Sequence, residues 1–202
     1  MGEWFSTQRF YDWLAPFYAP AQRLLPVWRR YTEAVRPWLP PAGAVLEIGP
    51  GPGVLLEKLA GRHPLAVGLD LSPGMLHQAQ QRLRDAHRPT RLVRGDAVRL
   101  PFARGRFDGV AITFTLSAIP DGLGAVREMA RVLRPAGVLA LVDAGYPGDS
   151  NLLGRGLARL WELGGDFMRD EAALMTQAGL QVIERREFGA FDSIRLVVGR
   201  KA

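Results

Sequence analysis

The chain has 202 residues, of which 23% are charged, and its formal net charge of +6 comes almost entirely from arginine. It has no cysteine, which excludes disulfides and thiolate metal sites, and its three histidines lack the paired spacing of a zinc site, so we expect no metal. The arginines are spread among acidic residues, which predicts a solvated surface and makes a nucleic-acid partner an unfavoured alternative. There is no apolar run of roughly 18 residues and no signal-peptide layout, so we expect a cytoplasmic protein.

The first 40 residues hold ten of the chain's 18 aromatic residues. Prolines predict two helices here, broken near Pro16 and Pro20 and again before Pro37. The segment either packs against outer helices or forms a lid that excludes water from a site. We expect one domain, with a helical lid over 1–40 and a core over 41–202. The aromatic side chains of the lid would also suit contact with a membrane surface.

A glycine-rich turn follows the first predicted strand. The run Val45-Leu46-Glu47-Ile48 suits a buried central strand, and Gly49-Pro50-Gly51-Pro52-Gly53 leads into a helix over 54–60. The glycines allow close approach of a ligand to the helix N-terminus. Val54 stands where the dinucleotide pattern needs its third glycine, and the prolines remove amide donors. A nucleoside without phosphates therefore fits better than a pyrophosphate.

The second predicted strand, over 65–70, ends in Asp70, which lies 17 residues after Gly53. This spacing is typical of an acid that binds ribose hydroxyls in nucleotide folds. The alternative role is a helix N-cap. Ser72 is already well placed to cap the helix over 73–86, so we expect Asp70 to contact ribose.

The remaining pattern alternates strands with helices. Asp96 follows a third strand and either accepts a hydrogen bond from a base amino group or stabilises an Asx-turn. We expect further strands over 91–94, 106–113 and 138–143, helices over 122–133 and 170–178, a polar glycine-rich stretch over 145–159, and a hairpin of strands over 180–188 and 193–200. This alternation predicts an α/β fold with a Rossmann-like sheet.

These motifs together resemble the class I S-adenosylmethionine-dependent methyltransferases. Glu47 to Gly53 is similar to their first motif, and Gly95 to Phe102 is similar to their Gly-Asp-Ala-x-x-Leu-Pro-Phe segment. Arg127 to Gly137 is similar to a segment of their small-molecule branch, which usually has glycine in place of Ala136. We expect this change to cost little because Gly137 keeps the flexible position. The resemblance implies a seven-stranded sheet of order 3-2-1-4-5-7-6 with strand 7 antiparallel.

The N-terminal segment resembles a narrower group. Phe10 to Tyr18, with Trp28-Arg29-Arg30 beyond it, is similar to the lead of ubiquinone/menaquinone C-methyltransferases and related phospholipid N-methyltransferases. In that group the tyrosine, here Tyr18, closes over the methionine end of the cofactor. The aspartate that usually follows it is Ala19 here. The resemblance implies methyl transfer to a small, apolar or lipid-like acceptor such as a quinone precursor or a phospholipid amine.

The resemblance also implies S-adenosylmethionine as cofactor, S-adenosylhomocysteine as product, and a set of site residues. Asp96 would accept from the adenine amino group and Leu71 would flank the ring, as would Met75 unless it only packs in the core. The expected cofactor-binding residues are Tyr18, Glu47, Gly49, Gly51, Gly53, Asp70, Leu71, Met75, Asp96, Ala97, Thr113 and Leu116.

The catalytic base and the oligomeric state stay open at this point. Tyr18, Asp143 and Tyr146 are weak candidates for a base, and each also suits plain packing or capping. An amine or an acidic enol would need no strong base. Three other functions remain as alternatives: a nicotinamide oxidoreductase, an RNA or protein methyltransferase, and a protein that binds S-adenosylmethionine without turnover.

Overall fold

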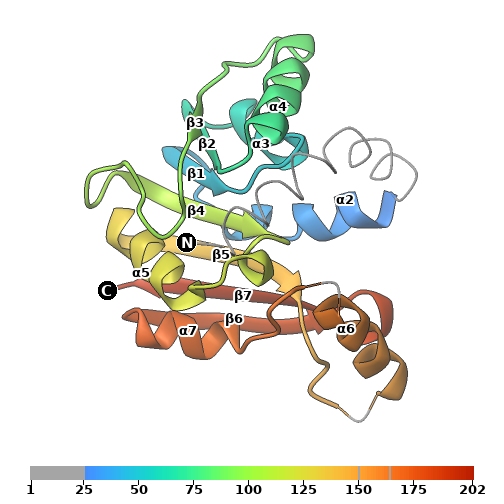
Figure 1. Cartoon of the computed structure of the whole chain (residues 1–202). Helices are drawn as coiled ribbons and strands as arrows, with labels where there is room; N and C mark the ends of the chain where they lie inside the picture. Colours follow the sequence, from blue (N-terminus) through green and yellow to red (C-terminus); the bar gives the residue numbers. More distant parts are fainter. Residues whose placement is uncertain (1–25, 150, 164) are drawn as a thin grey trace.

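A computed structural model describes residues 26–149, 151–163 and 165–202 (Figure 1). Tyr18 and most of the expected lid over 1–40 lie outside these described residues. Of that segment, the structure describes α2 (Pro26–Glu33) and the 3-10 turn η1 (Arg36–Trp38).

One mixed sheet runs through the fold in the order β3-β2-β1-β4-β5-β7-β6 (Figure 1). Strands β1 to β5 pair in parallel, and β7 pairs antiparallel with both β5 and β6. The expected strand order is therefore confirmed. The strands are β1 (Ala44–Ile48), β2 (Leu65–Asp70), β3 (Leu92–Arg94), β4 (Phe107–Thr113), β5 (Leu133–Ala144), β6 (Leu180–Phe188) and β7 (Ile194–Lys201).

Helices cover both faces of the sheet, and each face has its own apolar cluster. Residues of α2, α3 (Val54–Ala60) and α4 (Pro73–Asp85) pack on one face. Residues of α5 (Gly122–Val132) and α7 (Glu171–Gln177) pack on the other. The central strand β1 is buried along its whole length, as expected for a strand covered on both sides. None of the helices in the described part of the chain has the length and apolarity to cross a bilayer.

The helix starts follow simple capping chemistry. The Ser72 hydroxyl accepts a hydrogen bond from the Met75 N–H at 3.1 Å, with Pro73 in the first turn, which confirms the predicted cap of α4. Asp121 caps α5 through the Gly124 N–H at 2.8 Å. Helix α4 therefore begins directly after β2, whereas a loop over 114–121 separates α5 from β4.

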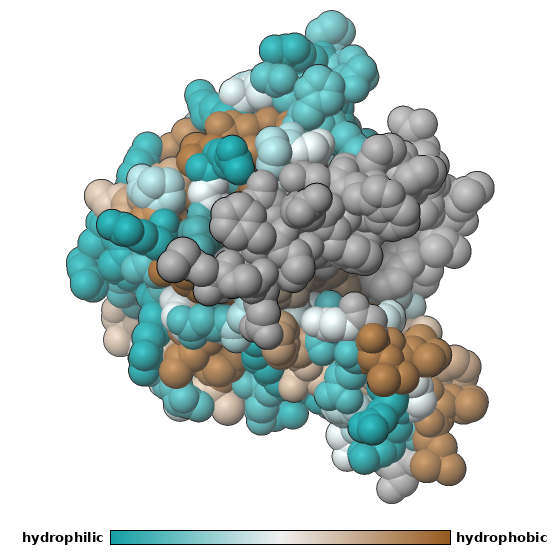
Figure 2. All heavy atoms as spheres, viewed as in Figure 1, coloured by the Kyte–Doolittle hydropathy of each residue, from teal (hydrophilic) through white to brown (hydrophobic). Residues whose placement is uncertain are grey.

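The polar, glycine-rich stretch over 145–159 leads into a helix that the sequence did not predict, since α6 spans Leu152–Leu163. Two glycines, Gly154 and Gly156, lower its intrinsic helix propensity. Gly154 is nonetheless required, since a Cβ there would collide with the Phe191 carbonyl of the 3-10 turn η3 (Ala190–Asp192). Four of the five leucines of α6 are exposed, and Figure 2 shows apolar side chains gathered over this helix at the lower right.

The expectation about Ala136 and Gly137 was wrong. Ala136 takes the left-handed conformation, with φ +61°, and Gly137 is not among the residues with positive φ. Gly137 is needed for a different reason, because a Cβ there would lie 2.8 Å from the Arg134 carbonyl oxygen. Strand β5 begins at Leu133 rather than Val138, since Leu133 pairs with Phe107 of β4 before this turn.

Candidate functional site

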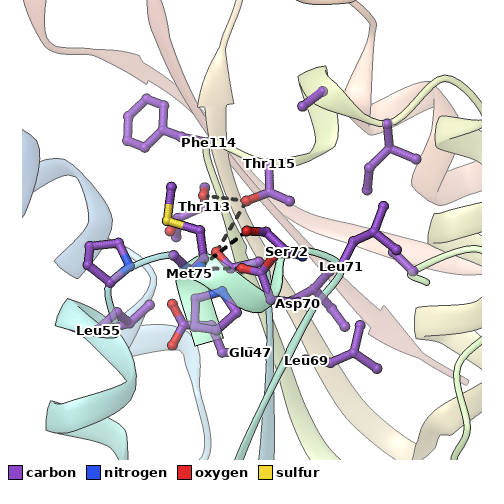
Figure 3. Close-up of a pocket in the computed structure, with 18 of the residues that line it drawn as sticks. Glu47, Leu55, Leu69, Asp70, Leu71, Ser72, Met75, Thr113, Phe114 and Thr115 are labelled. Carbon is purple, nitrogen blue, oxygen red and sulfur yellow. Dashed lines mark hydrogen bonds between the residues drawn. The ribbon is translucent and has the colours of Figure 1, made fainter. Parts of the chain in front are cut away.

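A cavity opens where the strand order reverses, at the carboxyl ends of β1, β2 and β4 (Figure 3). Open α/β sheets bind ligands at this position. The glycine loop after β1 forms one wall, and the segment after β2 with the start of α4 forms a second. The loops after β3 and β4 complete the lining, together with Thr32 of α2.

Two glycines of the loop after β1 line this cavity for different reasons. Gly49 has φ +63°, and a Cβ there would collide with the side chain of Thr115, whose hydroxyl donates to the Gly49 carbonyl at 3.3 Å. Gly51 has φ +51°, and a Cβ there would meet nothing within 4 Å, so its backbone faces open space. Gly53 does not line the cavity; a Cβ on it would lie 3.0 Å from the Cα of Ala79 in α4.

Asp70 holds the glycine loop against the end of β2. Its carboxylate accepts hydrogen bonds from the Gly51 N–H at 3.2 Å and the Ser72 N–H at 2.9 Å. Ser72 does cap α4, as predicted, but Asp70 still accepts hydrogen bonds from the backbone around it. A carboxylate oxygen can accept more than one hydrogen bond, so this role in the loop does not exclude contact of Asp70 with a ligand.

Glu47 is the most unusual group of the cavity. It is 2% exposed, and its Oε2 atom has no hydrogen-bond partner among the described residues. Burial, and after it the negative charge of Asp70, raises the pKa of Glu47 to about 8. A buried carboxyl oxygen without a hydrogen-bond partner costs stability, so this position is suited to an external cation or hydrogen-bond donor.

The far side of the cavity combines one acid with apolar walls. The Asp96 carboxylate accepts a hydrogen bond from the Val98 N–H at 2.9 Å, so Asp96 forms the Asx-turn that was one of its two predicted roles. Asp96 also lines the cavity, where the other predicted role would place it. Leu71, Met75 and Ala97 line it as well. Met75 is 3% exposed, so core packing and cavity lining are the same role here rather than alternatives.

Three further expected residues lie away from the cavity lining. Leu116 is 1% exposed and packs in the core, where its carbonyl accepts from Arg169 Nη1 at 2.7 Å. Tyr146 donates its hydroxyl hydrogen to Glu162, which raises the pKa of the tyrosine. Asp143 is buried behind the loop that follows β4. Thr113 does line the cavity, whereas Tyr18 lies outside the described residues.

Asp143 binds the loop after β4 to the end of β5. Its carboxylate accepts from both the N–H and the hydroxyl of Ser117, each at 2.9 Å, and from the Ala144 N–H at 2.8 Å. Burial raises its pKa to about 7, and the hydrogen bonds from Ser117 and Ala144 oppose that rise. This geometry makes Asp143 a residue that positions the cavity wall, since it does not itself line the cavity.

Sequence reasoning missed several lining residues. No sequence motif includes Thr32, which lines the cavity only because of how α2 packs. Ile119 could have been found as an apolar residue in the loop after β4. Phe114 falls in the stretch 113–117 where the sequence places the substrate, but its φ of +49°, a strained backbone for an aromatic residue, is not indicated by any sequence pattern.

Residues 46–141 match the family model described as a methyltransferase domain. This stretch contains the glycine loop, both acid-ended strands and the loop after β4. Residues 46–141 thus correspond to a methyltransferase domain, in keeping with the class I, S-adenosylmethionine-dependent methyltransferases that the sequence motifs resemble.

Curated relatives of this methyltransferase domain are named demethylmenaquinone methyltransferase. The one from Mycolicibacterium vanbaalenii is 43% identical over 121 residues, which cover 59% of this chain and 50% of the relative. The chain thus spans about half the length of such relatives.

Solved structures share the fold of the methyltransferase domain at low sequence identity. A methyltransferase from Thermotoga maritima has a TM-score of 0.73 at 22% identity and covers 94% of this chain and 98% of its own. The cyclase SpnF has a TM-score of 0.70 at 17% identity, with 86% of this chain and 80% of its own covered. The fold alone therefore does not identify the reaction.

Proposed function

We propose that this chain binds S-adenosylmethionine in the cavity over β1, β2 and β4 and directs its methyl group to a small apolar acceptor. The observation that carries the proposal is the buried Glu47 carboxyl, whose Oε2 lacks a partner among the described residues. The methionine end of this cofactor carries an ammonium and a sulfonium, and either cation would supply the missing interaction.

The other cavity residues fit the rest of the cofactor. Asp70 holds the glycine loop and offers a carboxylate for the ribose hydroxyls. Leu71 and Met75 offer an apolar surface for the adenine, and Asp96 offers a carboxylate for its amino group. Gly51 presents backbone without side-chain bulk toward open space. The loop also contains Pro50 and Pro52, which donate no N–H to a phosphate.

When bound, the cofactor supplies a methyl group on a positively charged sulfur, so the leaving group is already activated. The chain's own residues then have three tasks. Glu47, Asp70 and Asp96 orient the two ends of the cofactor, and the apolar wall excludes water. The loop after β4, which Asp143 holds through Ser117, positions the acceptor beside it.

The finer part of the proposal concerns the acceptor. The titratable side chains that line the cavity in the described part of the chain are the three acids Glu47, Asp70 and Asp96. Since these are assigned to the cofactor, the acceptor should ionise readily by itself, as an acidic enol or a quinol does. Phe114, Ala118 and Ile119 give its side of the cavity an apolar character. The names of the curated relatives support a quinone-like acceptor of this kind.

The proposal is tested by incubating the protein with S-adenosylmethionine labelled in the methyl group. The acceptor panel contains a short-chain demethylated naphthoquinol, a phenol and a phosphatidylethanolamine. We expect label in the extracted quinol, and Asp70→Ala is the matched control that should abolish it. Tight cofactor binding without transfer to any acceptor of the panel would instead identify a binding protein. Transfer to the phenol or lipid alone would overturn the quinone assignment.

A further inference from the structure

Helix α6 carries its apolar side chains on the outside. Leu152, Leu153, Leu160 and Leu163 are 81%, 65%, 64% and 77% exposed. Spacings of three, seven and eleven residues between members of this set place them on one side of the helix. We call these four leucines the α6 stripe.

The opposite side of α6 is anchored to the fold. Gly154 and Ala158 are buried, and Trp161 packs against the apolar cluster that also contains Tyr31. The helix is therefore docked through one side and leaves the α6 stripe to the outside, as Figure 2 shows. Contiguous exposed apolar surface of this kind usually marks an interaction site.

The apolar surface continues onto the hairpin between β6 and β7. Phe191 is 51% exposed, and its carbonyl lies against the backbone of Gly154. On the other side of this hairpin, the Phe188 ring packs edge-on against Tyr31 of α2, with ring centroids 5.5 Å apart. The hairpin thus connects α6 with α2.

A cationic groove lies at this junction with α2. Arg29, Arg30 and Arg186 line it together with Glu33, Ala34 and Phe188. The Glu33 carboxylate is already engaged, because it pairs with Arg29 at 3.1 Å, with Arg36 at 3.3 Å and with Lys58 at 3.5 Å. The groove therefore keeps an excess of positive charge.

The same end of the molecule contains the cavity. Thr32 of α2 lines the cavity, next in the chain to the Tyr31 that packs on the hairpin. The segment after α6 is attached to the cavity wall, since the Phe167 N–H donates to the Ser117 carbonyl at 2.8 Å. Arg169 of that segment donates to the carbonyls of Leu116 and Pro120 at 2.7 and 2.8 Å.

We propose that the α6 stripe, Phe191 and the arginine groove dock the chain on an anionic lipid bilayer. Leucines that face outward from an anchored helix enter the boundary between headgroups and acyl chains, and arginines beside them attract anionic headgroups. Arg155 and Arg159 of α6 are exposed and add to this charge, although Glu162 pairs with Arg159 at 3.8 Å. Docking brings the cavity to the surface in which a lipid-like acceptor dissolves.

The first test is co-sedimentation with vesicles of phosphatidylcholine, alone or with about a third phosphatidylglycerol. We expect binding to the anionic vesicles that weakens with salt. Leu152→Gln/Leu163→Gln should lower the affinity about tenfold or more, and Arg29→Gln/Arg30→Gln should lower it in low salt. The matched control is Arg84→Gln/Arg88→Gln, which removes the same charge from exposed positions on and beside α4 and should change nothing. Wild-type affinity in the leucine variant would overturn the proposal.

The second test uses the absence of cysteine from the chain. Leu163→Cys is labelled with a polarity-sensitive dye, with Gln81→Cys on α4 as the control site. We expect the emission at position 163 to shift to the blue on anionic vesicles, with no shift at position 81. A dye at 163 that is already shielded without lipid would contradict the proposal, and sedimentation velocity would then identify a second copy on the α6 stripe. Neither test depends on methyl transfer.

Discussion

Glu47 at the end of β1 and Asp70 at the end of β2 share one cavity, where burial first and the Asp70 charge second raise the pKa of Glu47 to about 8. A group with this pKa is largely protonated at pH 7 when the cavity holds no ligand. A bound cation would favour its ionised form. The negative charges in the cavity therefore favour a bound cation, and the burial of the Glu47 carboxyl lowers the stability of the ligand-free protein.

Glu47→Gln should separate the effect of Glu47 on cation binding from its effect on the stability of the ligand-free protein. The pKa of Glu47 is higher in the folded protein than the ordinary value of 4.5, so its contribution to stability is present below pH 4.5 and is lost as pH rises through about 8. Glutamine cannot ionise. At pH 8 the ligand-free variant should therefore exceed the wild type in free energy of unfolding by on the order of 1–3 kcal/mol. Urea denaturation at pH 5 and pH 8 measures this, and the variants should converge at the lower pH.

Gly49→Ala and Gly51→Ala form a matched pair in one loop. Both positions have positive φ, so each alanine should cost about 1 kcal/mol of backbone strain. Only at Gly49 would the new Cβ also collide with Thr115. Thermal unfolding should show the larger loss for Gly49→Ala, whereas Gly51→Ala should keep the fold and weaken cofactor affinity. Equal affinity of Gly51→Ala and the wild type would move the ligand away from this part of the loop.

Asp143→Asn tests the positioning role of Asp143. A backbone N–H donates to each of its carboxylate oxygens, from Ser117 to one and from Ala144 to the other, so an amide NH₂ must face at least one of these donors. We expect a loss of about 1–3 kcal/mol in the free energy of unfolding and a parallel weakening of cofactor affinity. Ser117→Ala should show the same pattern with a smaller size. A variant with intact stability and affinity but no turnover would instead place Asp143 in the chemistry.

Ala136→Gly should stabilise the protein. The substitution removes the left-handed strain of an alanine, about 1–2 kcal/mol, and returns part of that gain through the greater freedom of glycine in the unfolded chain. We expect a net gain of about 0.5–1 kcal/mol in chemical denaturation. Gly137→Ala is the contrast, because its Cβ would press on the Arg134 carbonyl and should destabilise. A loss of stability in Ala136→Gly would refute this assignment of the turn.

The acids of the cavity could be predicted from sequence because of one geometric rule. Glu47, Asp70 and Asp96 each stand at or just after the end of a strand, and the ends of parallel strands meet at one edge. Leu116 was placed in the cavity by family position and Gly53 by the spacing of the loop glycines, and the structure directs both into packing instead. Spacing along a chain does not tell which side of a loop faces the ligand.

Two other errors have a shared cause. Helix α6 was missed because helix prediction looks for an apolar side that faces a core, whereas four of the five leucines of α6 are exposed and two glycines interrupt the pattern. The strained conformation of Ala136 was missed because propensity assigns positive φ to the neighbouring glycine. At α6 and at Ala136 the tertiary structure overrides the conformation that the local sequence favours. Such conflicts between sequence and structure often mark functional or strained sites.

Calorimetric titration of the purified chain with S-adenosylmethionine at pH 7, in two buffers of different ionisation enthalpy, tests the central claim most directly. We expect one binding site and release of a proton, since cation binding lowers the pKa of Glu47. The heat should differ between the buffers for the wild type and agree between them for Glu47→Gln, whose affinity should fall about tenfold or more. No binding heat from S-adenosylmethionine or S-adenosylhomocysteine, or identical titrations for both proteins, would contradict it.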